Sequence, residues 1–265
     1  MSLTSFTIVT PCLNGAKTLA ATLESVRDQG YGGEVEHVVV DGGSTDGTLE
    51  ILSSAPDVRY ISEPDRGLSD AVNKGIRMAR NDVVGWLNAD DVYLPGALER
   101  VGKALAERPD ALWATGPCRI IGADGEEIRA GVTRYKDFFL RRYSYRLHLV
   151  QNFVSCPSTF VRREAFDRVG LLEERFKYSM DYDLWLRLGR IGPPLVLDAP
   201  LAAFRMAEGS LSMTGFERQF AEHTQNAREH GEGHPVAVAA NVVASRGIVA
   251  AYRGMRRLRG TRRPA

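Results

Sequence analysis

The chain has 265 residues, of which 44% are hydrophobic and 25% are charged. A chain of this length can bury a sizeable core, and the composition is ordinary for a soluble globular protein. Disordered, collagen-like and disulfide-scaffold proteins are therefore excluded. The 34 Lys and Arg residues against 33 Asp and Glu give a net charge of +1, a balance that at first argues against polyanionic partners.

This charge is unevenly distributed along the chain. No acidic residue follows Glu232, and residues 233–265 contain seven arginines. Residues 1–232 hold the other 27 basic residues and all 33 acidic ones, so their net charge is −6 while that of the tail is +7. An apolar stripe that includes Ile248 and Tyr252 runs beside the arginines, which predicts a basic amphipathic helix.

The cysteines and the N-terminal sequence bear on location. Cys12, Cys118 and Cys156 form an odd set without a Cys-x-x-Cys pair, which favours a reducing compartment over a disulfide framework or a zinc cluster. The N-terminal residues lack a basic segment followed by a long apolar one, so no signal peptide is expected. No run of 18 or more apolar residues occurs, and we therefore expect no spanning helix and a cytoplasmic protein.

In the first half of the chain, short apolar runs alternate with segments of helical periodicity. Leu19, Leu23 and Val26, for example, recur at the spacing of one helix face. This alternation is typical of βαβ units with parallel strands and right-handed crossovers. Strands are expected over 6–10, 35–40, 58–61, 83–87 and 111–115, and helices over 19–26, 68–80 and 95–108.

The pattern changes near residue 117. The segments 118–121 and 127–130 flank Ala-Asp-Gly-Glu, which predicts a hairpin. A basic, aromatic stretch follows over 135–145. Further strands are expected over 158–162, 195–197 and 201–205, and a helix over 181–188.

Polar loops follow three of the predicted strands. They are Thr-Pro-Cys-Leu-Asn-Gly at 10–15, Asp-Gly-Gly-Ser-Thr-Asp-Gly at 41–47 and Asn-Ala-Asp-Asp at 88–91. Because ligands bind beyond the carboxyl ends of the strands in an open parallel sheet, all three loops would open on one edge. Neither a G-x-G-x-x-G nor a P-loop pattern occurs in the first loop, which disfavours a dinucleotide fold and P-loop phosphate capture. Taken singly, the second loop is a surface turn and the third a helix cap region, but their common position favours a site.

Bare carboxylates at this edge would repel a phosphate ligand, and a divalent cation between them resolves the conflict. Asp90 and Asp91 offer the hard oxygen ligands that Mg²⁺ or Mn²⁺ prefers, with the ligand's own phosphates completing the shell. Asp41 is suited instead to accept hydrogen bonds from a base or ribose, because an ionised carboxylate only accepts.

With these motifs together, the chain resembles the family-2 glycosyltransferases, inverting enzymes with the GT-A fold that use nucleotide-sugar donors. The resemblance covers residues 5–215 and rests on five motifs that occur in order. They are Thr-Pro-Cys-Leu-Asn, Val-Val-Val-Asp-Gly-Gly-Ser-Thr-Asp-Gly-Thr, Ser-Glu-Pro-Asp-Arg-Gly-Leu-Ser-Asp-Ala-Val-Asn-Lys-Gly-Ile, Trp-Leu-Asn-Ala-Asp-Asp, and Gly-Leu-Leu-Glu-Glu-Arg-Phe followed by Asp-Tyr-Asp-Leu-Trp-Leu-Arg-Leu. It implies an α/β fold with a Rossmann-like, mostly parallel central sheet flanked by helices, and a C-terminal helical tail.

The resemblance also implies roles for individual residues. Asp90, in the place of the family's Asp-x-Asp motif, would be the principal ligand of Mn²⁺ or Mg²⁺, and Asp91 would assist directly or through water. Asp181 falls at the position of the general base. In the donor site, Thr10, Pro11 and Asn14 would surround the base and ribose of the nucleotide sugar, and Asp41 would bind the base. The segment that closes over the nucleotide would contain Asp70, Asn73 and Lys74. The nucleotide sugar would also be bound by Asn88, Ala89 and Asp90, and by Arg205 at a phosphate.

Asp181 suits its implied role chemically. Inverting transfer needs a base that deprotonates an acceptor hydroxyl as it attacks the anomeric carbon, and a carboxylate within hydrogen-bond reach can do this. As an alternative, Asp181 is the N-cap of the helix over 181–188, a position compatible with catalysis because a helix N-terminus stabilises a carboxylate. Asp183 is the rival base, although we expect it to point to solvent or to pair with Arg187.

Three positions depart from the family pattern. Met180 stands where relatives often have Glu, and Asn88 replaces the first acidic residue of the metal motif. The sequence Arg205-Met206-Ala207 lacks the histidine that relatives often carry two residues past the arginine, so no histidine ligand is assigned, although Gly-Ser at 209–210 still matches. For Arg205 itself, a surface ion pair is the alternative to a phosphate contact.

The chain divides into functional parts under this interpretation. Residues 1–232 form the glycosyltransferase domain, with a nucleotide-sugar-binding half over 1–116 and an acceptor-binding half over 117–232. The Gly-Glu-Gly-His-Pro sequence at 231–235 is the best boundary before the basic helical tail at 233–265.

The acceptor half contains candidate contacts. Ser155, Cys156 and Pro157 lie where relatives often contact the acceptor. Tyr178 and Trp185 either stack on a sugar ring or belong to the core.

We predict metal-dependent, inverting transfer from a nucleotide-diphosphate sugar, for preference a UDP-sugar, to a hydroxyl of a glycan or lipid-linked acceptor. The segment 236–263 either packs on the domain or lies on an anionic membrane surface. The membrane position is favoured because relatives often modify lipid-linked acceptors. It would place the cytoplasmic protein peripherally on the inner face of the membrane. No nucleic-acid motif accompanies the tail, and the oligomeric state stays open. The alternatives are a sugar-phosphate nucleotidyltransferase, although a Gly/Lys-rich N-terminal activation loop is missing, and a non-catalytic carbohydrate-binding protein with a degenerate site.

Overall fold

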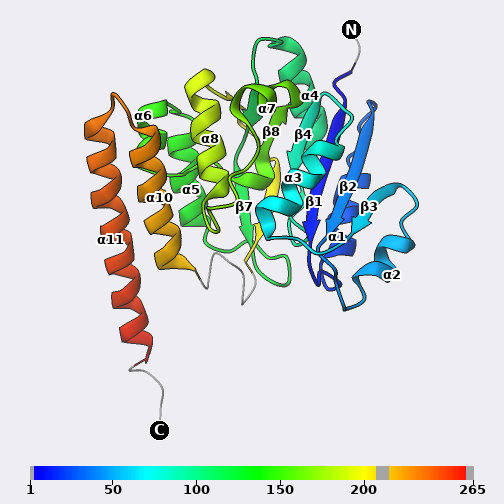
Figure 1. Cartoon of the computed structure of the whole chain (residues 1–265), viewed down its shortest axis with the longest axis horizontal. Helices are drawn as coiled ribbons and strands as arrows, with labels where there is room; N and C mark the ends of the chain where they lie inside the picture. The colour runs from blue at the N-terminus through cyan, green and yellow to red at the C-terminus, as the bar shows by residue number, and fades with distance from the viewer. Residues whose placement is uncertain (1–2, 207–214, 261–265) are drawn as a thin grey trace.

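A seven-stranded sheet runs through the molecule, with strand order β3-β2-β1-β4-β8-β6-β9 (Figure 1). The computed structural model describes residues 3–206 and 215–260, with side chains as far as Gly254, so the Gly-Ser match at 209–210 and the tail after residue 260 lie outside it. The strands are β1 (Phe6–Cys12), β2 (Val35–Asp41), β3 (Val58–Ser62), β4 (Val83–Trp86), β6 (Trp113–Thr115), β8 (Thr159–Arg162) and β9 (Leu195–Val196).

Most of this sheet is parallel, as predicted. β1 pairs in parallel with β2 and β4, β2 with β3, and β6 with β9, whereas β8 runs antiparallel to both β4 and β6. The register sets Cys12 opposite Asp41, and Asp41 opposite Ser62. The carboxyl ends of β1, β2 and β3 therefore share one edge, which is the edge expected to carry the polar loops.

Helices cover both faces of the sheet. On one face, Val72 of α3 (Leu68–Met78) packs in a cluster with Val9; on the other, Leu98 of α4 (Ala97–Glu107) packs with Ile8. Both faces of β1 are buried, which explains why its sequence is an apolar run without alternation. Close contact between α3 and β1 depends on Gly75, since a Cβ there would lie 2.2 Å from Val9 Cγ1.

The other helices have the following bounds: α1 (Leu19–Arg27), α2 (Thr48–Ser53), α5 (Ala130–Leu140), α6 (Tyr145–Val150), the 3₁₀ turn η1 (Cys156–Ser158), α7 (Arg163–Val169), α8 (Met180–Ile191), α10 (Phe216–His230) and α11 (Pro235–Gly260).

A second, three-stranded sheet joins the two halves of the chain. Its order is β5-β10-β7, formed by β5 (Val92–Tyr93), β10 (Ala202–Arg205) and β7 (Cys118–Ile121). The hairpin expected at 118–130 is reduced to one antiparallel bridge between Ile121 and Glu127, because the chain turns into α5 at Ala130. β10 carries Arg205 to the loop that follows β4.

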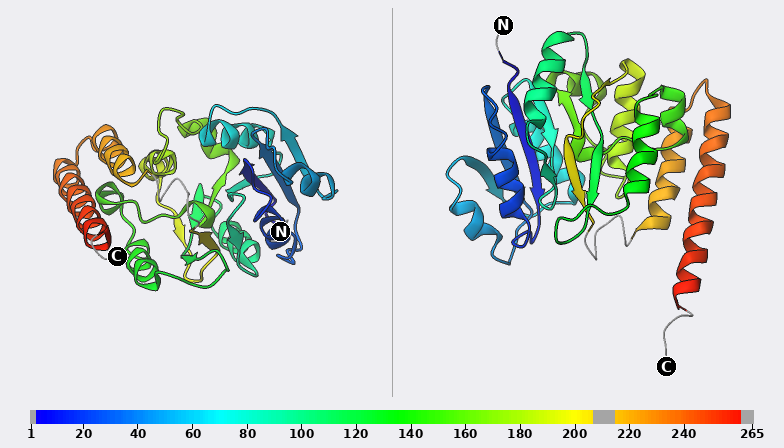
Figure 2. Two further views of the ribbon diagram at one scale, coloured as in Figure 1. Left: turned by 90° about the horizontal axis from the view of Figure 1, so that it is seen from below. Right: turned by 180° about the vertical axis from the view of Figure 1, so that it is seen from behind.

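The C-terminal helix α11 packs against the body of the molecule, beside α10 and at the opposite end from α2 (Figures 1 and 2). Ala237, Asn241 and Ser245 are buried on its inner face, at intervals of one helical turn. The Asn241 amide donates to the carbonyl oxygens of Leu149 and Val150 at 3.1 and 3.0 Å. The inner face of α11 is therefore packed on the domain, which is one of the two arrangements expected for the tail.

The segment Pro235–Gly254 of α11 is long and apolar enough to cross a membrane by length and composition, with a mean hydropathy of 1.3. This finding differs from our expectation that no segment would qualify. One such helix is weak support for a membrane span, since a helix in the core of a soluble protein passes the same test. On the outer face of the helix, Val236 and Val243 are 82% and 71% exposed, and Arg246, one turn after Val243, is exposed as well.

Candidate active site

The first two polar loops lie side by side at the edge of the sheet and are hydrogen-bonded to each other. The backbone N–H of Asn14 donates to Ser44 Oγ at 2.7 Å, and the backbone N–H of Thr45 donates to the side-chain oxygen Oδ1 of Asn14 at 2.9 Å. Asn14 adopts a left-handed φ of 53°, which Asn tolerates better than most residues. The predicted proximity of these loops is therefore observed, and Asn14 connects them.

Asp41 is fully buried within its own loop. Its carboxylate accepts hydrogen bonds from the backbone N–H groups of Gly43 and Ser44 and from the hydroxyls of Ser44 and Ser62. Burial by itself would raise the pKa of Asp41, but these hydrogen bonds outweigh it and hold the pKa below its ordinary value. Asp41 is therefore ionised and its acceptor positions are engaged by the loop.

Thr10 and Pro11 are buried at the end of β1. Thr10 Oγ1 lies 2.9 Å from His37 Nε2, and burial lowers the pKa of His37 to about 4, so this imidazole is neutral. The side chain of Thr10 is therefore buried against β2 at the base of the loop, whereas Asn14, later in the same loop, is exposed.

The loop after β4 holds its residues by a short chain of hydrogen bonds. Trp86 Nε1 donates to Asn88 Oδ1 at 2.8 Å, and Asn88 Nδ2 donates to Asp91 Oδ2 at 3.2 Å. The other oxygen of Asp91 accepts the Arg205 N–H at 2.9 Å. Asp91 is thus fully buried with both oxygens hydrogen-bonded, whereas Asp90 is partly exposed. Ala89, between Asn88 and Asp90 in the sequence, is buried.

The two neighbouring carboxyl groups have perturbed pKa values. Burial raises the pKa of Asp90, and burial together with the Asp90 charge raises that of Asp91 well above its ordinary range. A cation close to Asp90 would oppose both effects. Asp90 is therefore a suitable hard-oxygen ligand for a divalent ion, but it would need further ligands.

The described residues contain no group of three or more His, Cys, Asp or Glu side chains able to hold a metal ion. Mg²⁺ commonly binds through one or two carboxylates together with substrate phosphates and water. The residues present fit that type of site, with Asp90 as the accessible carboxylate.

Arg205 lies behind this loop. Its guanidinium donates to three backbone carbonyl oxygens, those of Asp90 at 3.0 Å, Gly122 at 3.0 Å and Ala123 at 2.8 Å. Among residues 3–206 and 215–260, the structure gives Arg205 these carbonyl contacts and no ion pair, which was the alternative expected from the sequence. Arg205 fixes the backbone of Asp90 against β7 and its turn.

The predicted closing segment lies at the N-terminus of α3. Lys74 Nζ contacts Asp65 Oδ1 at 2.7 Å and Glu63 Oε1 at 2.9 Å, and these partners raise the pKa of Lys74 above its ordinary value. Asp70 accepts from the N–H and guanidinium of Arg66, which lowers its pKa. Both charged groups are therefore paired with neighbouring residues in this structure.

Asn73 is buried, and its side chain holds α3 to a distant loop. Its amide donates to the Leu172 carbonyl and accepts the Leu172 N–H, both at 2.9 Å. The structure thus gives Asn73 a packing role that its motif alone did not indicate.

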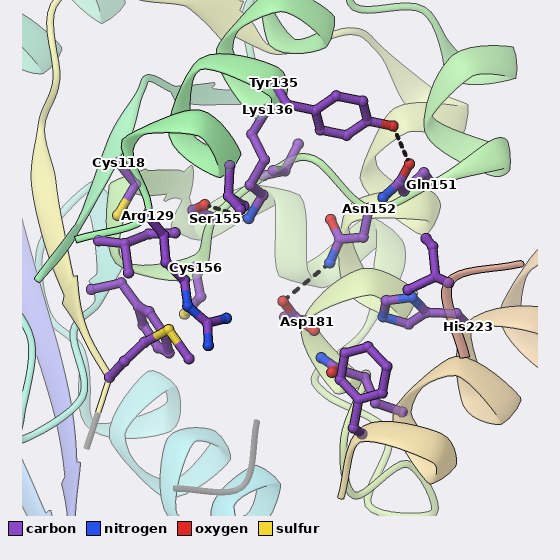
Figure 3. A pocket seen from close by; sticks show the side chains of 18 of the residues that line it. Cys118, Arg129, Tyr135, Lys136, Gln151, Asn152, Ser155, Cys156, Asp181 and His223 are labelled. Atoms are coloured by element: carbon purple, nitrogen blue, oxygen red, sulfur yellow. Dashed lines mark hydrogen bonds between the residues drawn. The ribbon is translucent and has the colours of Figure 1, made fainter. Parts of the chain in front are cut away.

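Asp181 lies in a cavity of about 950 Å³ that extends from Asn88 at the sheet edge to α10 and α11 (Figure 3). It belongs to the first turn of α8, where Ser179, two residues earlier, is the N-cap, so the alternative interpretation of Asp181 as the cap does not hold. Asn152 Nδ2 donates to Asp181 Oδ2 at 3.3 Å. Burial raises the pKa of Asp181, which makes its carboxylate a stronger base than an ordinary aspartate.

Asp183, the rival base, points away from this cavity. Its side chain is 1% exposed and pairs with Arg187 Nη2 at 2.7 Å and with His230 Nε2 at 2.8 Å. The expected pairing with Arg187 is observed, and exposure to solvent is not. Asp183 serves to hold α8 to α10.

Several cavity residues were not predicted. Lys136 Nζ donates to Ser155 Oγ at 2.9 Å, and the Tyr135 hydroxyl donates to Gln151 at 2.6 Å (Figure 3). Cys156 and Pro157 line the cavity as well, in the stretch expected to contact the acceptor. Lys136 and Tyr135 belong to the basic, aromatic segment that stood out in the sequence, but only the packing of α5 shows that it faces Asp181.

The two aromatic residues considered for sugar stacking, Tyr178 and Trp185, differ in their burial. Trp185 is 1% exposed and stacks on Trp113 at 6.0 Å between ring centroids, so it belongs to the core. Tyr178 is partly buried, and its backbone N–H donates to Glu222.

A mostly parallel sheet flanked by helices, with carboxylates at its edge and a cavity beside it, is the architecture of the GT-A type transferases. The family model for glycosyl transferase family 2 matches residues 7–170, and the chain belongs to this family. The chain is therefore a glycosyltransferase, and the resemblance found in its motifs is confirmed.

Individual relatives agree with this assignment. An uncharacterized glycosyltransferase of Mycobacterium tuberculosis is 29% identical over 202 residues, which are 74% of this chain and 73% of the relative. Among solved structures, the mannosyltransferase PcManGT from Pyrobaculum calidifontis, in complex with GDP-Man and Mn²⁺, has a TM-score of 0.64 at 18% identity and covers 96% of this chain and 81% of its own.

A second structure is similar to the same extent. TarS 1-349 of S. aureus, in complex with UDP-GlcNAc, has a TM-score of 0.64 at 19% identity. The match covers 84% of this chain and 66% of that one. At these identities the structural likeness shows the fold, and it confirms the expected architecture.

Proposed function

We propose that the protein transfers a sugar from a nucleotide-diphosphate sugar to an acceptor hydroxyl with inversion at the anomeric carbon, and that Asp181 is the general base. The observation that carries this proposal is the position of Asp181. It is a carboxylate of raised pKa in a cavity that also reaches Asn88, at the edge where the donor loops lie.

The donor side of the site is assigned to the loops at the sheet edge. Asn14 and Asp41 would contact the base and ribose, with Thr10 and Pro11 supporting them from β1. Contact between Asp41 and a base would require one of its present hydrogen bonds to be exchanged. Our proposed donor is a UDP-sugar, in line with the nucleotide bound by TarS, while PcManGT shows that the same fold also takes a GDP-sugar.

The α3 segment is proposed to close over the diphosphate. Lys74 would exchange Asp65 or Glu63 for a phosphate oxygen, and Asp70 and Asn73 would hold the segment in place. Asn88 and Ala89 would border the sugar-phosphate, and Arg205 would act through the backbone of Asp90 and not by direct contact.

A divalent ion, Mn²⁺ or Mg²⁺, is proposed as cofactor, held by Asp90 with Asp91 behind it. When bound, such an ion neutralises the charge that develops on the departing diphosphate. The protein residues have separate tasks: Arg205 and Asn88 orient the loop, and the Asn152 amide orients the Asp181 carboxylate that takes the acceptor proton.

The acceptor is proposed to be a glycan or a lipid-linked saccharide that enters the half of the molecule formed by residues 117–232. Exposed apolar residues on the outer face of α11, with the arginines that follow, support a peripheral position at an anionic membrane surface. We therefore propose two roles for the tail at 233–265. It holds the protein at the membrane surface, and the inner face of α11 forms one wall of the cavity that contains Asp181.

This function can be tested with purified protein and a panel of UDP-, GDP- and dTDP-sugars, with and without Mn²⁺. We expect a UDP-sugar to raise the melting temperature only when Mn²⁺ is present, since a ligand that binds the native state stabilises it. Product analysis by NMR should show the inverted anomer. A product with the retained anomer would exclude the inverting mechanism. Release of pyrophosphate from a sugar phosphate and NTP would indicate a nucleotidyltransferase. Binding without turnover of any donor would indicate a non-catalytic carbohydrate-binding protein.

A further inference from the structure

The cavity that contains Asp181 has two chemically different ends. Near Asp181 its lining is polar and includes Lys136, Gln151, Asn152 and Ser155. Toward the C-terminal helices it is lined mainly by apolar side chains, which we call the apolar arm. The arm consists of Phe216 and Phe220 on α10, Ile248 and Tyr252 on α11, and Val132 and Tyr135 on α5.

The aromatic rings of the arm are fixed by contacts with each other. Phe216 stacks on Tyr252 with 4.1 Å between ring centroids, and it lies 4.9 Å from Phe220. Phe220 in turn packs edge-on against His223 at 5.2 Å. The arm is therefore a wall built by two helices and not a set of mobile side chains on a surface.

None of the six residues of the arm is charged. Among the described residues that line the whole cavity, Asp181 is the only acidic side chain, and Arg129 and Lys136 are the basic ones. Burial lowers the pKa of His223, beside the arm, to about 4, so its imidazole is neutral at physiological pH. Apart from the two tyrosine hydroxyls, the polar side chains that α10 adds to the lining are Gln219 and His223, so a sugar ring in the arm would bury more hydroxyl groups than these can hydrogen-bond, which costs free energy.

The opposite side of the cavity supports the same assignment. On α5, Val132 and Tyr135 line the cavity and are also 45% and 46% exposed. Large apolar side chains that are exposed beside a cavity commonly mark a binding surface for an apolar ligand. The arm thus continues from the cavity toward solvent between α5 and α11.

We propose that the apolar arm binds the non-sugar, apolar group of an amphiphilic acceptor, such as an alkyl, acyl or isoprenoid chain. The hydroxyl-bearing end of that acceptor then lies at Asp181 and Asn152. This inference rests on the proposed function, because it takes Asp181 as the group that receives the acceptor proton. Of the two acceptor classes proposed above, it selects the one that carries a hydrocarbon group, and it assigns the residues that bind this group.

A test uses methyl, butyl, hexyl and octyl glucosides as probes, each below its critical micelle concentration, with binding measured by isothermal titration calorimetry. We expect the dissociation constant to fall with each added methylene, by up to about fourfold, which corresponds to full burial of a CH₂ group. Equal affinity for the methyl and octyl glucosides would overturn the proposal.

Variants locate the binding. Ala251→Trp fills the arm from an exposed position on α11 without removing a packed side chain, and Ile248→Ser makes its wall polar. Both should abolish the dependence on chain length. Val243→Ser is the matched control, because Val243 is on the outer face of the same helix. An unchanged dependence in Ala251→Trp would contradict the assignment even if Ile248→Ser failed to fold.

Nucleotide binding separates this inference from the proposed function. The melting-temperature shift with UDP-sugar and Mn²⁺ should persist in Ala251→Trp. If the shift occurs in the wild-type protein and the chain-length dependence does not, only the apolar-arm proposal is wrong. If the shift is absent from the wild-type protein, the proposed function is wrong.

Discussion

Neighbouring aspartates in this site differ in role because their surroundings differ. Asp91 is buried with both oxygens hydrogen-bonded, and Asp90 is partly exposed with Arg205 held on its carbonyl. Asp183 is paired with Arg187 and His230, and Asp181 faces the cavity. The motifs singled out all four aspartates, two after β4 and two in the first turn of α8, but hydrogen-bond partners decide which carboxylate is available.

Asp90→Asn should remove the part of nucleotide binding that depends on metal. At a ligand concentration of one hundred times Kd, wild-type protein gains about 2.7 kcal/mol of stability. In the variant, the gain with UDP-sugar should be the same with and without Mn²⁺. Differential scanning fluorimetry measures this, with Asp124→Asn in the exposed turn after β7 as control. A Mn²⁺-dependent gain that survives in Asp90→Asn would show that another group binds the metal.

The raised pKa of Asp181 predicts the pH dependence of transfer. A base must be ionised to accept the acceptor proton, so kcat/KM should fall as pH decreases through the raised pKa of Asp181. The midpoint of that fall is expected above 3.8, the ordinary value for aspartate. A pH profile with its acidic limb at or below 3.8 would argue against Asp181 as the base.

The same shift has a consequence for stability. A carboxyl group whose pKa is higher in the folded than in the unfolded protein favours folding while it is protonated, and that contribution is lost as pH rises through the folded pKa. At neutral pH the ionised, buried Asp181 therefore opposes folding. Asp181→Asn is expected to be at least as stable as the wild type, and a clear loss of stability in urea denaturation would contradict this.

At the scale of elements, the sequence predicted the first half of the fold well and the second half less well. β1 to β4 have local signals, namely apolar runs that end at polar loops. In contrast, α5, α6 and α10 have ordinary amphipathic or mixed sequences, and their positions depend on contacts with distant segments. The residues that complete the cavity, such as Lys136 and Asn152, lie on or beside these elements, so no local pattern could assign them to the site.

Asn241 is the clearest example of such a distant contact, since it joins α11 to the C-terminal end of α6. Asn241→Ala removes the side-chain donor of the Val150 carbonyl oxygen, whereas the Leu149 carbonyl oxygen keeps its hydrogen bond from the Tyr182 hydroxyl. We expect a loss of about 1–3 kcal/mol in the free energy of unfolding. Urea denaturation of this variant beside Val243→Ala, on the exposed face of the same helix, measures it. Equal stability of the two variants would mean that α11 does not depend on this contact.

At the scale of the whole molecule, the charge separation seen in the sequence has a structural counterpart. Asp41, Asp90 and Asp91 lie at the edge of the sheet where β2 and β4 end, and α11, which carries Arg246 and Arg253, lies at the opposite end of the molecule from α2 (Figure 2). Ile248 and Tyr252 of α11 line the cavity, and the outer face of the helix carries the exposed Val236, Val243 and Arg246. Removal of the whole helix would therefore disturb the site itself, and membrane binding has to be tested with point variants.

Val236→Asp and Val243→Asp place a negative charge on the outer face of α11. Because basic residues near an anionic surface contribute about 1 kcal/mol each and apolar contacts add to this, both variants should bind anionic vesicles more weakly than the wild type. Co-sedimentation with vesicles at low and high salt measures the effect, with Leu49→Asp on α2 as control. Wild-type binding by both variants would exclude this face as a membrane contact.

The central claim is that Asp181 takes the acceptor proton, and the transfer rate of Asp181→Asn tests it most directly. With Asp167→Asn, an exposed residue of α7, as control, the variant should retain the Mn²⁺-dependent melting shift with donor. Its transfer rate should fall by about 10²–10⁴-fold, the usual contribution of a general base. Transfer at the wild-type rate in Asp181→Asn, with donor binding intact, would contradict the proposed mechanism.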